Sequence, residues 1–165
     1  MKKQLAATLT IIIIPLFFVS CISSLLKDKA PSFSTEITLV APPKPFIKTD
    51  TSVFPSWKNN TTGNVISIVS DCNENSSYKL SNLHQLIENE LDGINVIKEE
   101  TTSLQKRPAL IRVINAHLDG QPIEIQSLSF KRKSCGYVAT LSGKINNLAS
   151  DKSQFEKFVN SFGFK

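Results

Sequence analysis

Residues 109–130 read ALIRVINAHLDGQPIEIQSLSF, and they carry the clearest structural signal in the sequence. Two runs rich in branched and aromatic side chains, residues 109–118 and 123–130, flank the dipeptide Asp119-Gly120. Both central positions of a type I′ turn need a positive φ, which Asp-Gly adopts more readily than most dipeptides. Pro122 is compatible with the returning strand, because proline is tolerated at strand ends and edges. The stretch therefore predicts a β-hairpin.

Further strands are predicted on both sides of this hairpin. Residues 64–70 are rich in β-branched side chains, and residues 94–102 form another such run. After a basic turn, alternate residues of the segment 135–141 are apolar or aromatic, as expected for a strand with one buried face. A short first strand is predicted near residues 52–57. Consecutive strands joined by short turns form an antiparallel sheet.

Two amphipathic helices complete the predicted domain. Leucine and isoleucine recur at spacings of three and four over residues 80–91, and Gly93 is suited to end that helix. Near the end of the chain, Asp151 is a predicted N-cap with Gln154 as its capping-box partner. The helix that follows has one apolar stripe, formed by Phe155, Phe158, Val159 and Phe162. The order β-β-α-β-β-β-β-α predicts an α+β fold in which helices cover an antiparallel sheet.

Several of these segments resemble the PsbP/Mog-like fold, in which an antiparallel sheet lies between helices. The resemblance begins at Phe54-Pro55-Ser56-Trp57 and at residues 63–68. The Asp119-Gly120 hairpin, the Cys135-Gly136-Tyr137 strand and the closing helix fit the same pattern, so that the resemblance covers about residues 46–165. It implies α/β/α layers. It transfers no catalytic residue, and a shared fold does not establish a shared function.

The N-terminus has the features of a bacterial export signal. Lys2 and Lys3 precede an uncharged, mostly apolar segment at residues 5–19, which is shorter than the about 20 residues of a membrane-spanning helix. The end of this segment and the two residues after it, Phe18-Val19-Ser20-Cys21, resemble the lipobox of bacterial lipoproteins, in which the cysteine is acylated. This predicts lipid attachment at Cys21. An ordinary cleaved signal or an uncleaved anchor helix is the alternative interpretation.

These features divide the chain into three parts. Residues 1–20 are the predicted signal peptide, residues 21–50 a lipidated N-terminus and tether rich in Pro, Ser and Thr, and residues 51–165 a single globular domain. A short strand at residues 36–40 is the alternative for part of the tether. Loss of Lys2 and Lys3 changes the basic residues from 19 to 17 against 14 acidic ones, which leaves a net charge of +3. Such a charge does not indicate a nucleic-acid-binding protein.

The two remaining cysteines, Cys72 and Cys135, are predicted to form a disulfide, because exported proteins commonly use an even set of cysteines in this way. The alternative is two buried thiols. No Cys-x-x-Cys motif is present, and no metal or cofactor site is predicted.

The histidines offer only a weak case for catalysis. His84 and Glu88 are four residues apart, which suggests a solvated ion pair at the edge of the helix stripe. His117 lies at a strand end, where a surface or packing role is expected. The run Lys131-Arg132-Lys133 is interpreted as a charged hairpin tip, with anionic lipid head groups or an acidic partner as the alternatives.

No known catalytic motif is present, so no catalytic residue is assigned. The sequence predicts an envelope lipoprotein held to the membrane by its acyl chains. Asp after the acylated cysteine is an inner-membrane retention signal in enterobacterial lipoproteins, and by that resemblance Ile22 after Cys21 implies the outer membrane. Its domain is expected to be a non-catalytic binding or assembly module for an envelope protein partner. The alternatives are a small hydrolase that uses His84 or His117, and a carrier of a lipid or small ligand.

Overall fold

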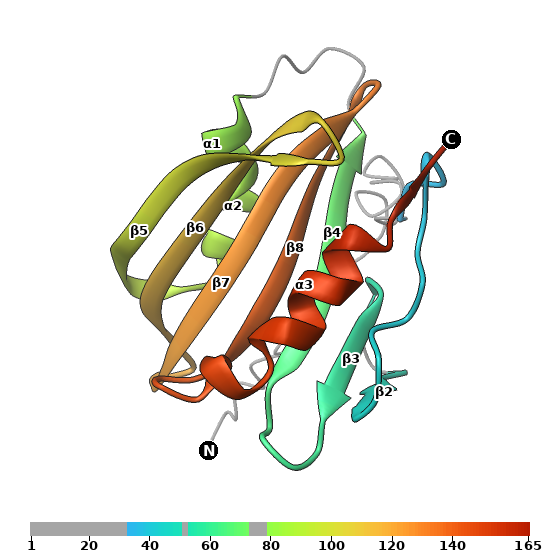
Figure 1. Cartoon of the computed structure of the whole chain (residues 1–165). Helices are drawn as coiled ribbons and strands as arrows, with labels where there is room; N and C mark the ends of the chain where they lie inside the picture. Colours follow the sequence, from blue (N-terminus) through green and yellow to red (C-terminus); the bar gives the residue numbers. More distant parts are fainter. Residues whose placement is uncertain (1–32, 51–52, 73–78) are drawn as a thin grey trace, which may run out of the picture. The chain divides into compact units, whose positions relative to one another are not determined.

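The computed structural model describes residues 33–50, 53–72 and 79–165. Its main body is a seven-stranded antiparallel sheet with the strand order β2-β3-β4-β8-β7-β6-β5 (Figure 1). In chain order the strands are β2 (Phe46–Lys48), β3 (Ser56–Asn59), β4 (Val65–Cys72), β5 (Asp92–Leu104), β6 (Arg107–Leu118), β7 (Gln121–Arg132) and β8 (Cys135–Lys144).

The hairpin predicted around Asp119-Gly120 is confirmed. Asp119 and Gly120 have φ values of 50° and 73°, and Leu118 pairs directly with Gln121. The same register continues to Ala109 opposite Phe130, so the two strands pair over their whole predicted length. Because adjacent side chains alternate between faces, this register determines which residues of β6 and β7 reach each side of the sheet.

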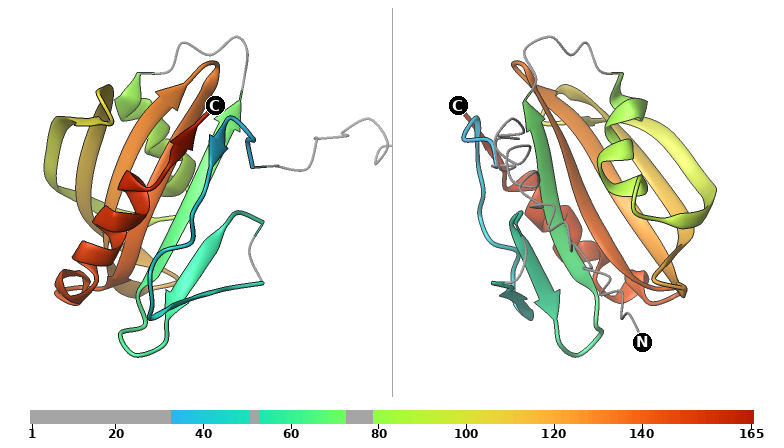
Figure 2. Two further views of the ribbon diagram at one scale, coloured as in Figure 1. Left: turned by 45° about the vertical axis from the view of Figure 1, so that its right-hand side comes forward. Right: turned by 180° about the vertical axis from the view of Figure 1, so that it is seen from behind.

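Helices cover both faces of the sheet, which confirms the α+β class. The helix α3 (Lys152–Asn160), preceded by the 3₁₀ turn η1 (Leu148–Ser150), lies on one face (Figure 1). The short helices α1 (Leu80–Leu83) and α2 (Gln85–Glu88) lie on the opposite face (Figure 2). The single helix predicted over residues 80–91 is wrong in its continuity, because it is interrupted at His84.

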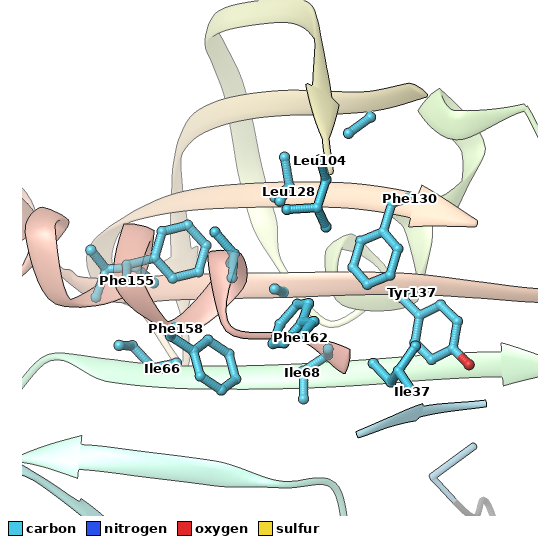
Figure 3. Close-up of a cluster of buried hydrophobic side chains, with 14 of the residues drawn as sticks. Ile37, Ile66, Ile68, Leu104, Leu128, Phe130, Tyr137, Phe155, Phe158 and Phe162 are labelled. Carbon is cyan, nitrogen blue, oxygen red and sulfur yellow. The ribbon is translucent and has the colours of Figure 1, made fainter. Parts of the chain in front are cut away.

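Aromatic side chains make up seven of the eighteen buried residues of the hydrophobic core between the sheet and α3. Phe155, Phe158, Val159 and Phe162 are all buried, as the predicted stripe requires (Figure 3). Phe158 packs edge-on against Trp57 at 5.2 Å between ring centroids, and Phe130 stacks on Tyr137 at 5.0 Å. Each fully buried side chain of this size stabilises the fold by about 1.5–3 kcal/mol. This cluster is therefore a structural core.

The start of α3 is held differently from the predicted capping box. Asp151 is the N-cap residue, but its side chain makes no capping hydrogen bond. Its buried carboxylate instead accepts hydrogen bonds from Asn59 Nδ2 at 3.0 Å, Thr62 Oγ1 at 2.6 Å and Asn64 Nδ2 at 2.8 Å. These three donors belong to the β3–β4 hairpin. Asp151 therefore links α3 to the sheet, and the capping-box prediction with Gln154 is wrong.

The folded domain begins earlier in the chain than residue 51. The strand β1 (Ile37–Thr38) pairs with β9 (Gly163–Phe164) in a separate two-stranded sheet, and β2 joins the main sheet. Ile37 and Phe46 are buried in the core. The predicted tether is therefore wrong for residues 33–50, whereas the alternative strand within residues 36–40 is confirmed. Sequence periodicity could not reveal β1 and β2, because strands of two and three residues are too short to show a repeat.

Candidate functional site

A groove of about 280 Å³ lies between α3 and the exposed part of the sheet. Its apolar floor consists of Ile111, Val113, Leu128, Phe155 and Val159. Figure 1 shows why the groove forms: β5 and β6 extend sideways beyond the strands that α3 covers. The sequence predicts the strands and α3 separately. It does not predict the groove, because the groove depends on which strands α3 leaves uncovered.

Charged side chains border both sides of this groove. On the β5 side, Lys98 Nζ and Glu100 Oε2 form an ion pair at 2.9 Å, with about half of each side chain exposed. On the α3 side, the lining residues include Lys152 and Glu156. Exposed pairs of this kind contribute about 0–1 kcal/mol to stability. They are therefore available to form other charge pairs at little cost to the fold.

Strand β5 is exposed along almost its whole length. Twelve of its thirteen residues are exposed, and only Leu104 is buried. It is the last strand of the main sheet, so no described strand pairs with its outer edge. Ile94, Val96 and Ile97 expose 40–55% of their surfaces there. Long exposed edges with apolar side chains are positions where another extended chain can add to a sheet.

His84 does not occupy the predicted position at the edge of a helix. Its side chain is 0% exposed, and its Nδ1 lies 2.9 Å from Ser127 Oγ. The Ser127 hydroxyl also lies 3.2 Å from the carbonyl oxygen of Arg112, and when its proton is donated there it accepts from His84 Nδ1–H. The other ring nitrogen, Nε2, is buried and has no hydrogen-bond partner among the described residues.

The surroundings of His84 favour its neutral form. Burial, followed by the positive charge of Arg112, lowers the pKa of His84 from 6.5 to about 4, although Glu99 acts in the opposite direction. Glu88 does not pair with His84. It accepts from Arg112 Nη1 at 2.8 Å, while Arg112 Nε donates to Glu99 at 2.6 Å. The predicted solvated His84–Glu88 pair is therefore wrong.

His117 lies apart from His84, at the exposed end of β6. The surface role predicted for it is confirmed. His84 and Ser127 are 0% and 2% exposed, whereas His117 is exposed at the end of its strand. Among the described residues, no three His, Cys, Asp or Glu side chains are grouped as metal ligands.

The predicted disulfide between Cys72 and Cys135 is confirmed. The two residues face each other on the neighbouring strands β4 and β8, and the bond closes a segment with a sequence separation of 63. Cys21, the predicted lipid-attachment residue, lies outside the described residues, as do the predicted signal peptide and the first part of the tether. None of the described helices is long and apolar enough to cross a membrane.

Comparison with known proteins supports a PsbP-like fold. Cyanobacterial PsbP (CyanoP) from Synechocystis sp. PCC 6803 matches with a TM-score of 0.57 and 10% identity, over 90% of this chain and 99% of that chain. PA94 from Pseudomonas aeruginosa, a protein of unknown function, matches with a TM-score of 0.51 and 14% identity, over 81% of this chain and 85% of that chain.

A third structure is more distant. LpqN of Mycobacterium tuberculosis, which is involved in cell envelope biogenesis, has a TM-score of 0.41 and 8% identity over 82% of each chain. That score is too low to support an argument about this protein. No protein family and no curated protein sequence matches the chain. At these low identities the structural matches show the fold alone, which is an α+β fold of the PsbP type.

Proposed function

We propose that this protein is a lipid-anchored protein of the bacterial envelope whose domain is a non-catalytic binding module. In this proposal, an extended segment of a partner protein adds to the outer edge of β5, and the adjacent groove receives one of its apolar side chains. The observation that carries the proposal is the exposure of β5, with twelve of thirteen residues accessible on an edge that no described strand covers.

The geometry of β5 supports an extended partner. Its register shifts are confined to Asp92–Lys98, and the pairing with β6 is regular from Lys98 to Leu104. A strand added along this regular part would form backbone hydrogen bonds and place alternate side chains on the groove side. Lys98 and Glu100 lie on that side and would select opposite charges at alternate positions of the partner.

The size of the groove favours a side chain over a lipid. Small-molecule sites are commonly about 300–1,000 Å³, whereas this groove has about 280 Å³ and is open to solvent. Its floor is apolar and its borders are charged, which suits one apolar side chain flanked by polar ones. The catalytic alternative has less support, because the Ser127 hydroxyl near His84 is directed to the Arg112 carbonyl in the interior.

The anchoring part of the proposal is supported by the lipobox-like sequence that ends at Cys21. Metabolic labelling with a radioactive fatty acid tests it. We expect the wild-type chain to be labelled and Cys21→Ser to be unlabelled. Undiminished labelling of Cys21→Ser would contradict attachment at this residue.

The binding part is tested by photo-crosslinking in intact cells. A photoreactive amino acid replaces Thr101 on β5 or, as the control, Lys58 on β3, and both positions are exposed. We expect a discrete adduct at Thr101 only, with the linked residue in an extended segment of another protein. A synthetic peptide of that segment should protect β5 amides from hydrogen exchange. The double variant Lys98→Glu/Glu100→Lys, which keeps the net charge, should weaken that peptide's binding.

Several results would contradict the binding proposal. An adduct between two copies of this chain would make β5 a self-association surface. Equal adducts at Thr101 and Lys58 would indicate nonspecific contact. The absence of any adduct at Thr101, with the protein present at its normal level, would remove the reason to regard β5 as a docking edge.

A further inference from the structure

Basic side chains gather at one end of the sheet. At the β5–β6 turn these are Lys106 and Arg107, the first residue of β6. At the β7–β8 turn they are Lys131 and Arg132, which end β7, and Lys133 in the turn itself. The strands β5 to β8 are joined by consecutive hairpins, so the first and third of these turns lie at the same end (Figure 1). We call these five residues the basic end.

The basic end is only partly neutralised. Glu36 pairs with Lys133, and Asp71 lies at the same level, because it faces Gly136 on β8 and Gly136 faces Lys131 on β7. Among the described residues, the five basic residues and these two acidic residues together have a net charge of +3. Residues 21–165 also have a net charge of +3, from 17 basic and 14 acidic residues, so the other charged residues of that segment balance one another.

The opposite end of the sheet has a different character. It carries the acidic residues Glu90, Asp92 and Asp119 at the ends of β5 and β6, all of them exposed. One basic residue, Lys144 at the last position of β8, also lies at this opposite end of the sheet. The charges of the protein are therefore separated along the strand direction, and opposite charge on a binding surface would orient the domain.

Several of the basic residues are held in place by the terminal segments. Arg132 Nη2 donates to the carbonyl oxygen of Lys165, and the guanidinium of Arg107 lies 4.1 Å from the centre of the Phe164 ring. Lys106 is exposed at the tip of its turn, and Lys133 keeps 57% of its side chain exposed although it pairs with Glu36. The basic end thus combines positioned guanidinium groups with accessible lysines.

The described chain begins at this same end. Phe33 packs against Tyr137 at 6.2 Å between ring centroids, and the Ser34 N–H donates to Ser70 Oγ at 2.9 Å. Tyr137 and Ser70 are paired residues near the start of β8 and the end of β4. In Figure 1 the first described residues, in blue, lie beside the C-terminus in the same region.

The length of the preceding chain connects this end to the anchor. Twelve residue steps separate Cys21 from Phe33, and an extended chain spans at most about 3.6 Å per residue. A lipid on Cys21 would therefore keep Phe33, and the basic end with it, within about 43 Å of the bilayer surface. Membrane phosphates would then be the anionic groups at the highest local concentration.

We infer that the basic end is a docking surface for the anionic head groups of the membrane that holds the anchor. This inference rests on the anchoring part of the proposed function. Each lysine or arginine near an anionic surface strengthens docking by about fivefold, and salt screens the effect within a Debye length. Docking would direct the acidic end away from the bilayer. The strand β5 would then run from the membrane side of the domain toward that end.

Lysine footprinting of the full acylated chain tests this inference. The protein is reconstituted into vesicles of phosphatidylcholine alone or of phosphatidylcholine with phosphatidylglycerol, and flotation with the neutral vesicles measures anchoring. Acetylation of exposed lysines is then quantified by mass spectrometry. We expect Lys106 and Lys133 to be protected at least threefold in anionic vesicles only, and Lys58 and Lys144 to react equally in both. High salt should remove the protection.

A pair of matched variants completes the test. Lys106→Gln/Lys133→Gln should weaken docking by roughly 25-fold, on the basis of about fivefold per lysine, and abolish the protection of Lys131 in anionic vesicles. Lys58→Gln/Lys144→Gln removes the same charge elsewhere and should retain that protection. If the wild-type chain fails to float with neutral vesicles, the anchoring proposal and this inference are both overturned.

Other results would overturn the inference alone. Flotation without any protection specific to anionic vesicles would mean that the basic end only maintains solubility. Equal protection in neutral vesicles would assign the effect to the anchor. Protection of Lys106 and Lys133 in intact cells, without protection in anionic vesicles, would identify an acidic protein partner instead.

Discussion

A fall in pH from 7.5 to 5.5 is expected to destabilise the domain through His84. The ring is 0% exposed, and burial together with Arg112 lowers its pKa from 6.5 to about 4. Its Nδ1 lies 2.9 Å from Ser127 Oγ, and its Nε2 is buried with no hydrogen-bond partner among the described residues. Protonation would leave an N–H at Nε2 with no acceptor in this part of the structure, and a buried charge without a partner is costly.

The size of the effect follows from the two pKa values. In the unfolded chain His84 binds a proton near pH 6.5, whereas in the folded chain it does so only near pH 4. Between these values the unfolded state holds more protons, so stability falls as the pH falls. At pH 5.5 the loss is about 1.4 kcal/mol, and it approaches about 3 kcal/mol near pH 4.

Urea unfolding followed by circular dichroism measures this effect at both pH values, with the disulfide kept oxidised. His84→Gln should be less stable at pH 7.5 than the wild type, but it should lose about 1.4 kcal/mol less on acidification. If His84→Gln and the wild type lose the same stability between pH 7.5 and 5.5, protonation of His84 has no free-energy cost in the folded state, and the reasoning is refuted.

Three further predictions concern single contacts, each measured by urea unfolding. Gly136→Ala should cost about 1–3 kcal/mol, because the added methyl overlaps Leu83, and Leu83→Ala in the same background should cost less than in the wild type; additive effects would contradict a clash. Asp151→Asn should cost about 2–3 kcal/mol, since the amide cannot accept from all three donors of the β3–β4 hairpin; a loss below about 0.5 kcal/mol would count against this network. Reduction of the Cys72–Cys135 disulfide should lower the free energy of unfolding by about 4 kcal/mol, as expected for a loop of 63 residues. The reductant should not change the stability of the double variant Cys72→Ala/Cys135→Ala, which has no disulfide to lose.

Most of the regular elements could be predicted from the sequence. The strands β4 to β8 and the helix α3 were found close to their observed positions because each is long enough to show its own period. The Asp119-Gly120 hairpin needed only two residues, because their backbone preferences specify the turn. The strand β1 was predicted only as an alternative for part of the tether. The strands β2 and β9 were missed because they have two or three residues and are held by tertiary pairing.

The sites were less predictable than the fold. His84 and Glu88 have the spacing of a helical pair, yet His84 is buried beneath the sheet face and Glu88 binds Arg112 from β6. Asp151 has the sequence position of a helix cap, yet its carboxylate is used by a distant hairpin. In each case the partner comes from a segment far along the chain, which local spacing cannot indicate.

The antiparallel hairpins, the apolar stripe of α3 and the disulfide could be predicted from the sequence, because local periods specify the first two and because Cys72 and Cys135 are the pair that is left once Cys21 is assigned to lipid. The exposed edge at β5, the groove between β5 and α3, and the meeting of two basic turns where the described chain begins could be found only in the folded structure. The physical reason is that strand order and helix cover set the exposure of a residue, and both are properties of contacts between segments distant in the sequence.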